Sequence, residues 1–115
     1  MFTAYVVVTL LAIAANAFAA TLDFVRYKQV LNNAARVGVP ESWLIMLGIL
    51  KAAGALGLLL GLIGVPLIGT AAAIGLILFF VGAIITHLRA RYYSLGFPSA
   101  YLLLAVAALV LDLAT

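Results

Sequence analysis

A few polar side chains interrupt an otherwise apolar sequence, and these are the groups that could do chemistry. Asn16 and Asp23 lie in and just after the first apolar stretch. Lys51 interrupts the second stretch, and His87, the single histidine, follows the third. A charge inside a membrane costs about 2.5–3.5 kcal/mol on insertion scales, so such groups usually bind a ligand, carry a proton or pair with another charge. We therefore take these four side chains as the candidate site.

The composition places these groups in a membrane protein. Of the 115 residues, 69% are hydrophobic and 8% are charged, whereas a soluble domain carries about 25% charged residues. The net charge of +3 does not come from a basic cluster interleaved with aromatic residues, so nothing indicates nucleic-acid binding. The chain has no cysteine, which excludes thiol redox chemistry and iron–sulfur ligation by this chain alone.

The lengths of the apolar stretches predict an all-α fold, a bundle of four transmembrane helices in a single domain covering residues 1–115. A helix needs about 20 apolar residues to cross the hydrocarbon core. The predicted helices run over about 2–22, 43–63, 67–86 and 99–115. Gly64-Val65-Pro66 forms the turn between the second helix and the third.

Basic residues predict the orientation of the bundle. They lie between the first two helices and between the last two: Arg26, Lys28, Arg36, Arg89 and Arg91. Loops rich in Lys and Arg stay in the cytoplasm. We therefore expect loops 23–42 and 87–98 to be cytoplasmic and both termini to lie outside.

The loop after the first helix carries an amphipathic pattern. Its apolar residues recur at helical spacing: Phe24, Tyr27, Leu31, Ala34 and Ala35. This predicts a cytoplasmic helix that either continues the first span or lies along the headgroups. It could be a solvated connector that anchors to anionic lipid, or it could be a surface on which a partner docks.

The first helix carries a polar stripe that should face the bundle interior. Tyr5, Thr9, Asn16 and Asp23 are separated by four, seven and seven residues, so they fall within about 40° of one another around the helix. Lys51 lies about 12 Å into the second helix, at 1.5 Å per residue. It either snorkels to the headgroups or pairs with Asp23, Asn16 or both.

The sequence leaves two possible roles for His87 and one expected environment for Asp112. His87 is either a structural residue at the interface or a member of one cytoplasmic-side cluster with the three polar groups above. Such a cluster could hold an anionic or quinone-like headgroup, or relay a proton. Asp112 lies near the end of the fourth helix, where we expect it to be solvated. No catalytic constellation, metal-binding cluster or phosphate-binding loop is present in the sequence.

Glycines predict where the helices approach one another. Small residues allow close helix packing in lipid. The expected packing residues are Gly48, Gly54, Gly57 and Gly61 on the second helix, and Gly75 and Gly82 on the third. They pack inside the bundle or, alternatively, form the contact face of a homodimer.

Three segments resemble the DoxX-like family of small membrane proteins. These are the glycine-rich run 47–61, the run 71–89 that contains Thr86-His87, and Gly38-Val39-Pro40 followed by Trp43. The resemblance covers about residues 5–112. One departure is that 19–23 reads Ala-Ala-Thr-Leu-Asp, where members of the family often carry a glycine and a lysine.

The resemblance implies a four-helix protein of the bacterial inner membrane. The family is named after a subunit associated with thiosulfate–quinone oxidoreductase, and some members are proposed to sit in oxidoreductase or oxidative-stress assemblies. We therefore expect an accessory subunit that has no catalytic activity and no cofactor of its own, with a quinone only through a partner. The partner would be the lipid bilayer together with a membrane oxidoreductase or a second copy of the chain. The alternatives are a bundle that binds or transports a lipid-like molecule or small anion in a polar cavity around Lys51, and a purely structural bundle.

Overall fold

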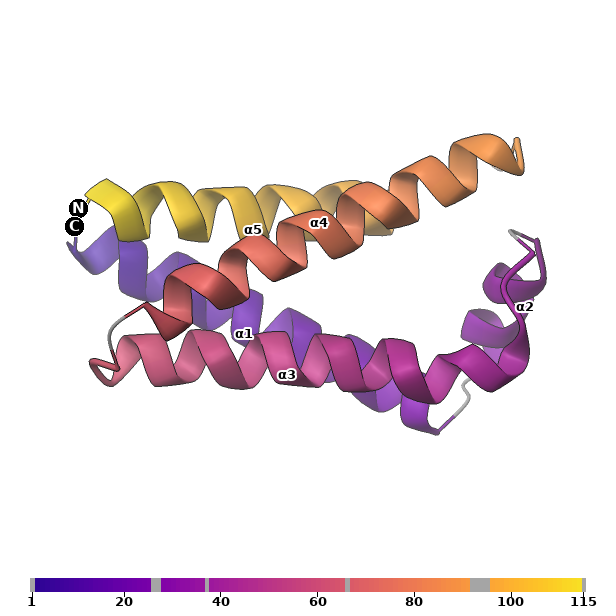
Figure 1. The fold of residues 1–115 in the computed structure, drawn as a ribbon, viewed down its shortest axis with the longest axis horizontal. Coiled ribbons are helices and arrows are strands. Elements are labelled where there is room, and N and C mark those ends of the chain that lie inside the picture. Colours follow the sequence, from indigo (N-terminus) through magenta and orange to yellow (C-terminus); the bar gives the residue numbers. More distant parts are fainter. Residues whose placement is uncertain (1, 26–27, 37, 66, 92–95, 115) are drawn as a thin grey trace.

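The computed structural model describes residues 2–25, 28–36, 38–65, 67–91 and 96–114. This part of the chain is helical and contains no strand. Its elements are α1 (Phe2–Phe24), α2 (Lys28–Arg36), the short 3-10 helix η1 (Glu41–Trp43), α3 (Leu44–Leu62), α4 (Ile68–Arg89) and α5 (Gly96–Ala114) (Figure 1). The all-α prediction is confirmed.

The helices follow from runs of Ala and Leu, which favour helix strongly, and glycines end two of them. Gly64 adopts a φ of 98° after α3, where the Val65 amide donates to Leu60 O at 3.0 Å and the Gly64 amide to Gly61 O at 3.2 Å. This paired bonding is a Schellman motif, which favours glycine at its left-handed position. Gly38, with a φ of 77°, follows α2 in the same arrangement. The chain can therefore turn sharply into α4.

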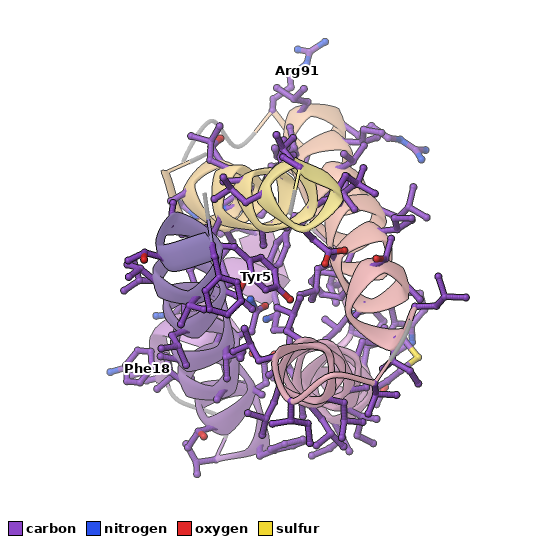
Figure 2. All side chains as sticks on the ribbon, turned by 90° about the vertical axis from the view of Figure 1, so that its left-hand side faces the viewer. Tyr5, Phe18 and Arg91 are labelled. Atoms are coloured by element: carbon purple, nitrogen blue, oxygen red, sulfur yellow. The ribbon has the colours of Figure 1, made fainter. Side chains whose placement is uncertain are left out.

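The four long helices form a ring in which α1 and α4 lie on opposite sides. Helix α1 packs against α3 and α5, and α4 packs against the same two helices. Figure 2 shows this ring from one end. Both chain termini lie at one end of the bundle, which we call the terminal end, and α2 lies at the other, which we call the α2 end (Figure 1).

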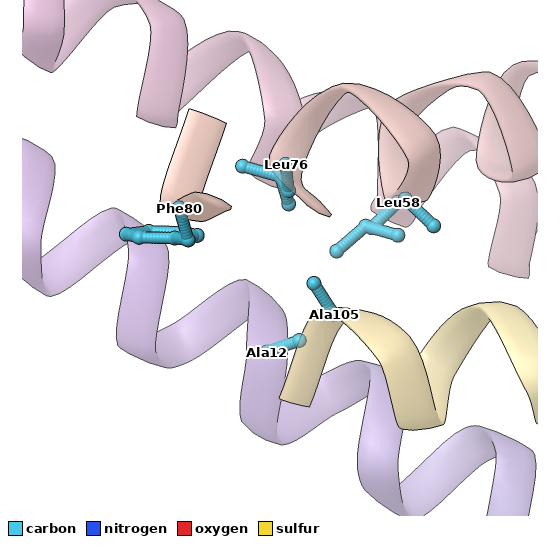
Figure 3. Packing of buried hydrophobic residues seen from close by; sticks show 6 residues of the cluster. Ala12, Leu58, Leu76, Phe80 and Ala105 are labelled. Atoms are coloured by element: carbon cyan, nitrogen blue, oxygen red, sulfur yellow. The ribbon is translucent and has the colours of Figure 1, made fainter. Parts of the chain in front are cut away.

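The middle of the ring is packed by apolar side chains from all four helices. We call this cluster the apolar layer: Ala12, Leu58, Ala73, Leu76, Phe80 and Ala105. Its labelled members converge in Figure 3. Each of the six is at most 4% exposed, so the layer closes the centre of the bundle.

Most other large apolar side chains point outward. Phe18 is 63% exposed and points away from the ring (Figure 2), and Leu78 and Leu103 are 67% and 69% exposed. Lipid tolerates such a surface, whereas a soluble monomer rarely exposes a large apolar patch. Helices α1, α3 and α4 are long and apolar enough to cross a membrane, and α5 contributes a shorter apolar stretch, Pro98–Ala114.

The helix ends differ from the predicted ones where they bear on the site. Helix α1 continues to Phe24, so Asp23 lies inside the helix. Helix α4 continues to Arg89, so His87 is also helical. The amphipathic segment forms a helix of its own, α2, although Arg26 and Tyr27 lie outside the described residues.

The glycines of α3 make close contacts, as predicted, but those of α4 named above do not. A Cβ at Gly57 would lie 2.6 Å from the Ala72 Cβ, and one at Gly61 would lie 2.6 Å from the Gly69 Cα. Gly75 and Gly82 are exposed, and a Cβ there would meet nothing within 4 Å. They therefore make no close contact inside the bundle, because helical spacing shows a shared face but not which neighbour that face meets, and the contact face of a homodimer stays the prediction for them.

These contacts predict opposite effects of alanine at two glycines. Gly61→Ala should destabilise the bundle, because the new methyl group meets backbone that cannot rotate away, and overpacking costs about 1–3 kcal/mol. Gly82→Ala should be neutral or stabilise by up to about 1 kcal/mol, the usual gain from alanine in a helix. Unfolding of both variants in detergent micelles measures the difference. Equal stability of the two variants would contradict the close approach of α3 and α4 at Gly61.

Candidate functional site

The polar stripe of α1 faces the interior of the ring, as its spacing predicted. Thr9, Asn16 and Asp23 are 1%, 0% and 3% exposed, and Tyr5 is also buried. Figure 2 shows Tyr5 directed into the middle of the four helices. The small Ala12 and Ala20 are buried on the same face, whereas Phe18 and other large apolar side chains of α1 point outward, so α1 presents a polar edge to the bundle and an apolar surface to lipid.

Lys51 and Asp23 form an ion pair inside the bundle. The Lys51 Nζ donates to Asp23 Oδ2 at 2.8 Å, and the two side chains are 15% and 4% exposed. The predicted contact between Lys51 and Asp23 is therefore present, and the ammonium ends at this carboxylate rather than at the headgroups. Asn16 instead donates from Nδ2 to Ala12 O at 2.8 Å in its own helix.

An aromatic chain continues from the ion pair across the bundle. The Lys51 Nζ lies 5.5 Å from the centre of the Phe79 ring, within range of a cation–π attraction. Phe79 packs edge-to-face on Phe80 at 5.0 Å, and Phe80 packs on Tyr101 at 5.3 Å. The Tyr101 hydroxyl donates to Ala15 O at 3.0 Å. The α2 half of the bundle is thus tied together from α3 through α4 and α5 back to α1.

Gly48 allows the two charges to meet. A Cβ at this position would lie 2.8 Å from Phe24 Cε1 and 3.2 Å from the Asp23 Cβ. The missing side chain lets α1 approach α3 one turn before Lys51, which brings Asp23 within reach of the ammonium. Helical spacing placed Gly48 at a packing contact but gave no sign that the contact serves the ion pair.

His87 lies at a different level of the bundle from Lys51. Its Nδ1 is 2.8 Å from Ala83 O in its own helix. Phe79, which lies beside the Lys51 ammonium, is eight residues earlier in α4, and that spacing corresponds to about 12 Å along the axis. The ion pair forms without the histidine, which is nearer the α2 end.

A second polar contact, at the terminal end, was missed from the sequence. The Thr70 hydroxyl donates to Asp112 Oδ2, joining α4 to α5. Asp112 is only partly exposed, so the expectation that it is simply solvated at the interface is wrong. The only signal in the sequence is that both groups lie near the same end of neighbouring helices. Their 42-residue separation and the unknown rotation of each helix hide the pairing.

Two features complete the site. Within the described residues, no three His, Cys, Asp or Glu side chains come together in a way that could hold a metal ion. An apolar groove of about 650 Å³ opens between α3 and α4, and its lining includes Ala53, Gly57, Ala71 and Phe79. Neither Lys51 nor His87 lines it, although Phe79 both lines the groove and lies beside the Lys51 ammonium.

The ion pair predicts strongly non-additive effects of substitution. Lys51→Met leaves a buried carboxylate without its partner, and Asp23→Leu leaves a buried ammonium, so each single variant should lose about 3–5 kcal/mol. The double variant should recover most of that loss, because an apolar pair of similar size often replaces a buried ion pair without cost. Unfolding of all four proteins in micelles gives the coupling energy.

The matched control is Lys28→Met, which removes an exposed charge from α2 and should leave stability unchanged. Additive losses at positions 51 and 23 would show that the two charges do not depend on each other.

Comparison with known proteins agrees with this architecture. The sequence profile of the DoxX-like family matches residues 7–109, a span that includes the ion pair and nearly all of the four long helices. A search among curated proteins found no match, and a search among solved structures found none either. Since the matched region covers most of the chain, this protein belongs to the DoxX-like family.

Proposed function

We propose that this chain is a small accessory subunit of a membrane assembly and that its partner supplies any redox cofactor. The observation that carries the proposal is the ion pair: Lys51 and Asp23 satisfy each other inside the bundle. Charges used in this way fix a shape, and a protein with a fixed apolar shape and no metal-binding group among its described residues acts best by packing against another membrane protein. A quinone-linked or oxidative-stress assembly is the partner that the family suggests.

We also propose the full membrane topology. All four long helices span, with both termini outside and α2 on the cytoplasmic side of a bacterial inner membrane. The termini lie together at the end opposite α2 (Figure 1), as an even number of spans requires. Helix α5 has 19 residues, which extend about 28 Å, close to the roughly 30 Å of the hydrocarbon core. Lys28 and Arg36 in α2 and Arg89 at the end of α4 satisfy the positive-inside rule.

The accessory role predicts a specific partner that depends on Lys51. Purification of the tagged protein from native membranes in mild detergent should recover a membrane oxidoreductase in fixed proportion. Lys51→Met should still insert, because a single charge is not needed for insertion, but it should recover less partner, because the α1–α3 packing is disturbed. Mass spectrometry of the recovered complexes measures both.

Arg91→Met, at an exposed position just after α4, serves as the control and should recover as much partner as the original chain. Recovery of the chain alone, or only of pairs of the chain, would refute the accessory role and, in the second case, favour a homo-oligomer. Full partner recovery by Lys51→Met would refute the role of the ion pair in docking.

The groove between α3 and α4 favours a second function, the binding of a lipid-like molecule. Its volume of about 650 Å³ lies in the range of small-molecule sites, roughly 300–1,000 Å³. Its apolar lining suits an acyl or isoprenoid chain better than a small anion. A quinone would lie there with its tail against Ala71 and Gly57, and with its ring near Phe79.

Filling the groove should separate the two functions. Ala71→Phe places a large ring in the groove and should abolish binding of decylubiquinone, measured as retention in native mass spectrometry or as a shift in melting temperature. Ile74→Phe, exposed on the same helix and outside the groove lining, should bind as the original chain does. Equal binding by both variants would exclude the groove as the site.

A further inference from the structure

The interior of the bundle alternates between polar and apolar layers along its length. Helices α1 and α5 run in opposite directions, and Ala12 lies in the same cluster as Ala105. Seven residues toward the terminal end from that level, about 10 Å away, are Tyr5 on α1 and Asp112 on α5. Asp112 accepts its hydrogen bond from Thr70 there. Two carboxylates therefore lie on opposite sides of the apolar layer, Asp112 at the terminal end and Asp23 at the α2 end.

Two buried polar atoms flank the apolar layer without a partner. Thr9 Oγ1 and Asn16 Oδ1 make no hydrogen bond to any other group in the part of the chain that the structure describes, and their residues are 1% and 0% exposed. An unsatisfied buried polar group is destabilising, and in hydrocarbon no solvent relieves it. Both atoms lie on the same interior face of α1, one on each side of Ala12.

Water is the partner whose chemistry fits these atoms. Buried water molecules typically bond to otherwise unsatisfied polar groups inside proteins. A hydroxyl can donate to water and accept from it, and an amide oxygen accepts from it. Water at Thr9 would continue the polar contacts toward Asp112, and water at Asn16 would continue them toward Asp23. The apolar layer, and nearer the α2 end the buried Ala20, would then be the apolar parts of a path through the bundle.

We propose that the bundle interior conducts protons between Asp112 and Asp23 through water molecules held at Thr9 and Asn16. A proton joins the Asp112 carboxylate at the terminal end, passes along hydrogen bonds of the bound water, and reaches the Asp23 carboxylate, from which it leaves at the α2 end. Only O–H bonds form and break, one proton enters for each that leaves, and the membrane potential or pH gradient drives the transfer. Chains of polar side chains inside membrane helices serve as proton relays elsewhere.

The apolar layer acts as the barrier of this path. Thr9 and Asn16 are seven residues apart, so about 10 Å of helix separates them. Ala12, which lies between them on the same helix, packs in one buried cluster with Leu58, Leu76 and Phe80 (Figure 3). A constriction of this kind controls conduction by excluding water. Protons cross when water enters the layer, so the flux should be slow in the original chain and should rise when the layer becomes polar.

Proton flux into reconstituted vesicles tests the proposal. The full chain is incorporated into phosphatidylcholine–phosphatidylglycerol vesicles that contain a pH-sensitive dye, and a potassium gradient with valinomycin drives protons inward. The original chain should exceed protein-free vesicles, and Thr9→Val should fall to their rate. Leu58→Asn, or the milder Ala105→Ser, should exceed the original chain.

The matched control for Thr9→Val is Thr21→Val. Thr21 is exposed on the same helix and bonds Ala17 O, so its replacement should leave the flux unchanged. Circular dichroism of the same vesicle samples measures the amount of folded protein, so that a loss of proton flux can be distinguished from unfolding.

Three results would overturn the proposal. The first is a flux no higher than that of protein-free vesicles for both the original chain and Ala105→Ser. The second is a flux of Thr9→Val equal to that of the original chain. The third is an equal loss of flux in Thr9→Val and Thr21→Val. Because the assay contains no other protein, its outcome is independent of the accessory role, which depends on recovery of a partner.

Discussion

The ion pair between Lys51 and Asp23 fixes how the bundle is assembled. Lipid offers no hydrophobic driving force between helices, so contacts of other kinds must select their register. A slip of α1 against α3 by one turn, 5.4 Å, would separate two charges now 2.8 Å apart and leave both in an apolar medium. That alternative is costly because a buried charge without its partner is strongly destabilising. The pair therefore admits one register for α1 and α3.

The rest of the interior follows from that register. With Asp23 held beside Gly48, the antiparallel course of α1 and α3 brings Ala12 to the level of Leu58, where the apolar layer forms. It also brings the Tyr5 hydroxyl to the α3–α4 crossing, 3.8 Å from where a Gly61 Cβ would lie. The small residues of α3 allow two close approaches. One, at Gly48, brings Asp23 within reach of Lys51, and the other, at Gly61, brings the α3 backbone against Gly69 of α4.

The sequence was sufficient to predict what depends on one helix at a time. The spacing of Tyr5, Thr9 and Asn16 identified the interior face of α1, because helical geometry alone decides it. Opposite charge made Asp23 one of the two predicted partners of Lys51, with Asn16 as the other, and the structure shows the contact with Asp23. The Thr70–Asp112 and Tyr101–Ala15 contacts depend on how far each helix is rotated about its own axis, which periodicity in α4 and α5 does not fix. The same ambiguity applies to Gly75 and Gly82, which make no close contact inside the bundle.

The polar groups of the bundle interior divide into those with a partner inside the chain and those without one, and in the proposed path the paired Asp23 and Asp112 both join helices and carry the proton. Lys51, Asp23, Thr70, Asp112 and Tyr101 each have a partner within the chain, and each contact joins two different helices. The Thr9 hydroxyl and the Asn16 oxygen have none among the described residues, so they do not hold the helices together and cost stability instead. An isosteric valine at Thr9 would remove that cost. Retaining a polar group where an apolar one would be more stable is expected of a position that serves a function rather than the fold, and this contrast places the chemistry of the bundle on either side of the apolar layer.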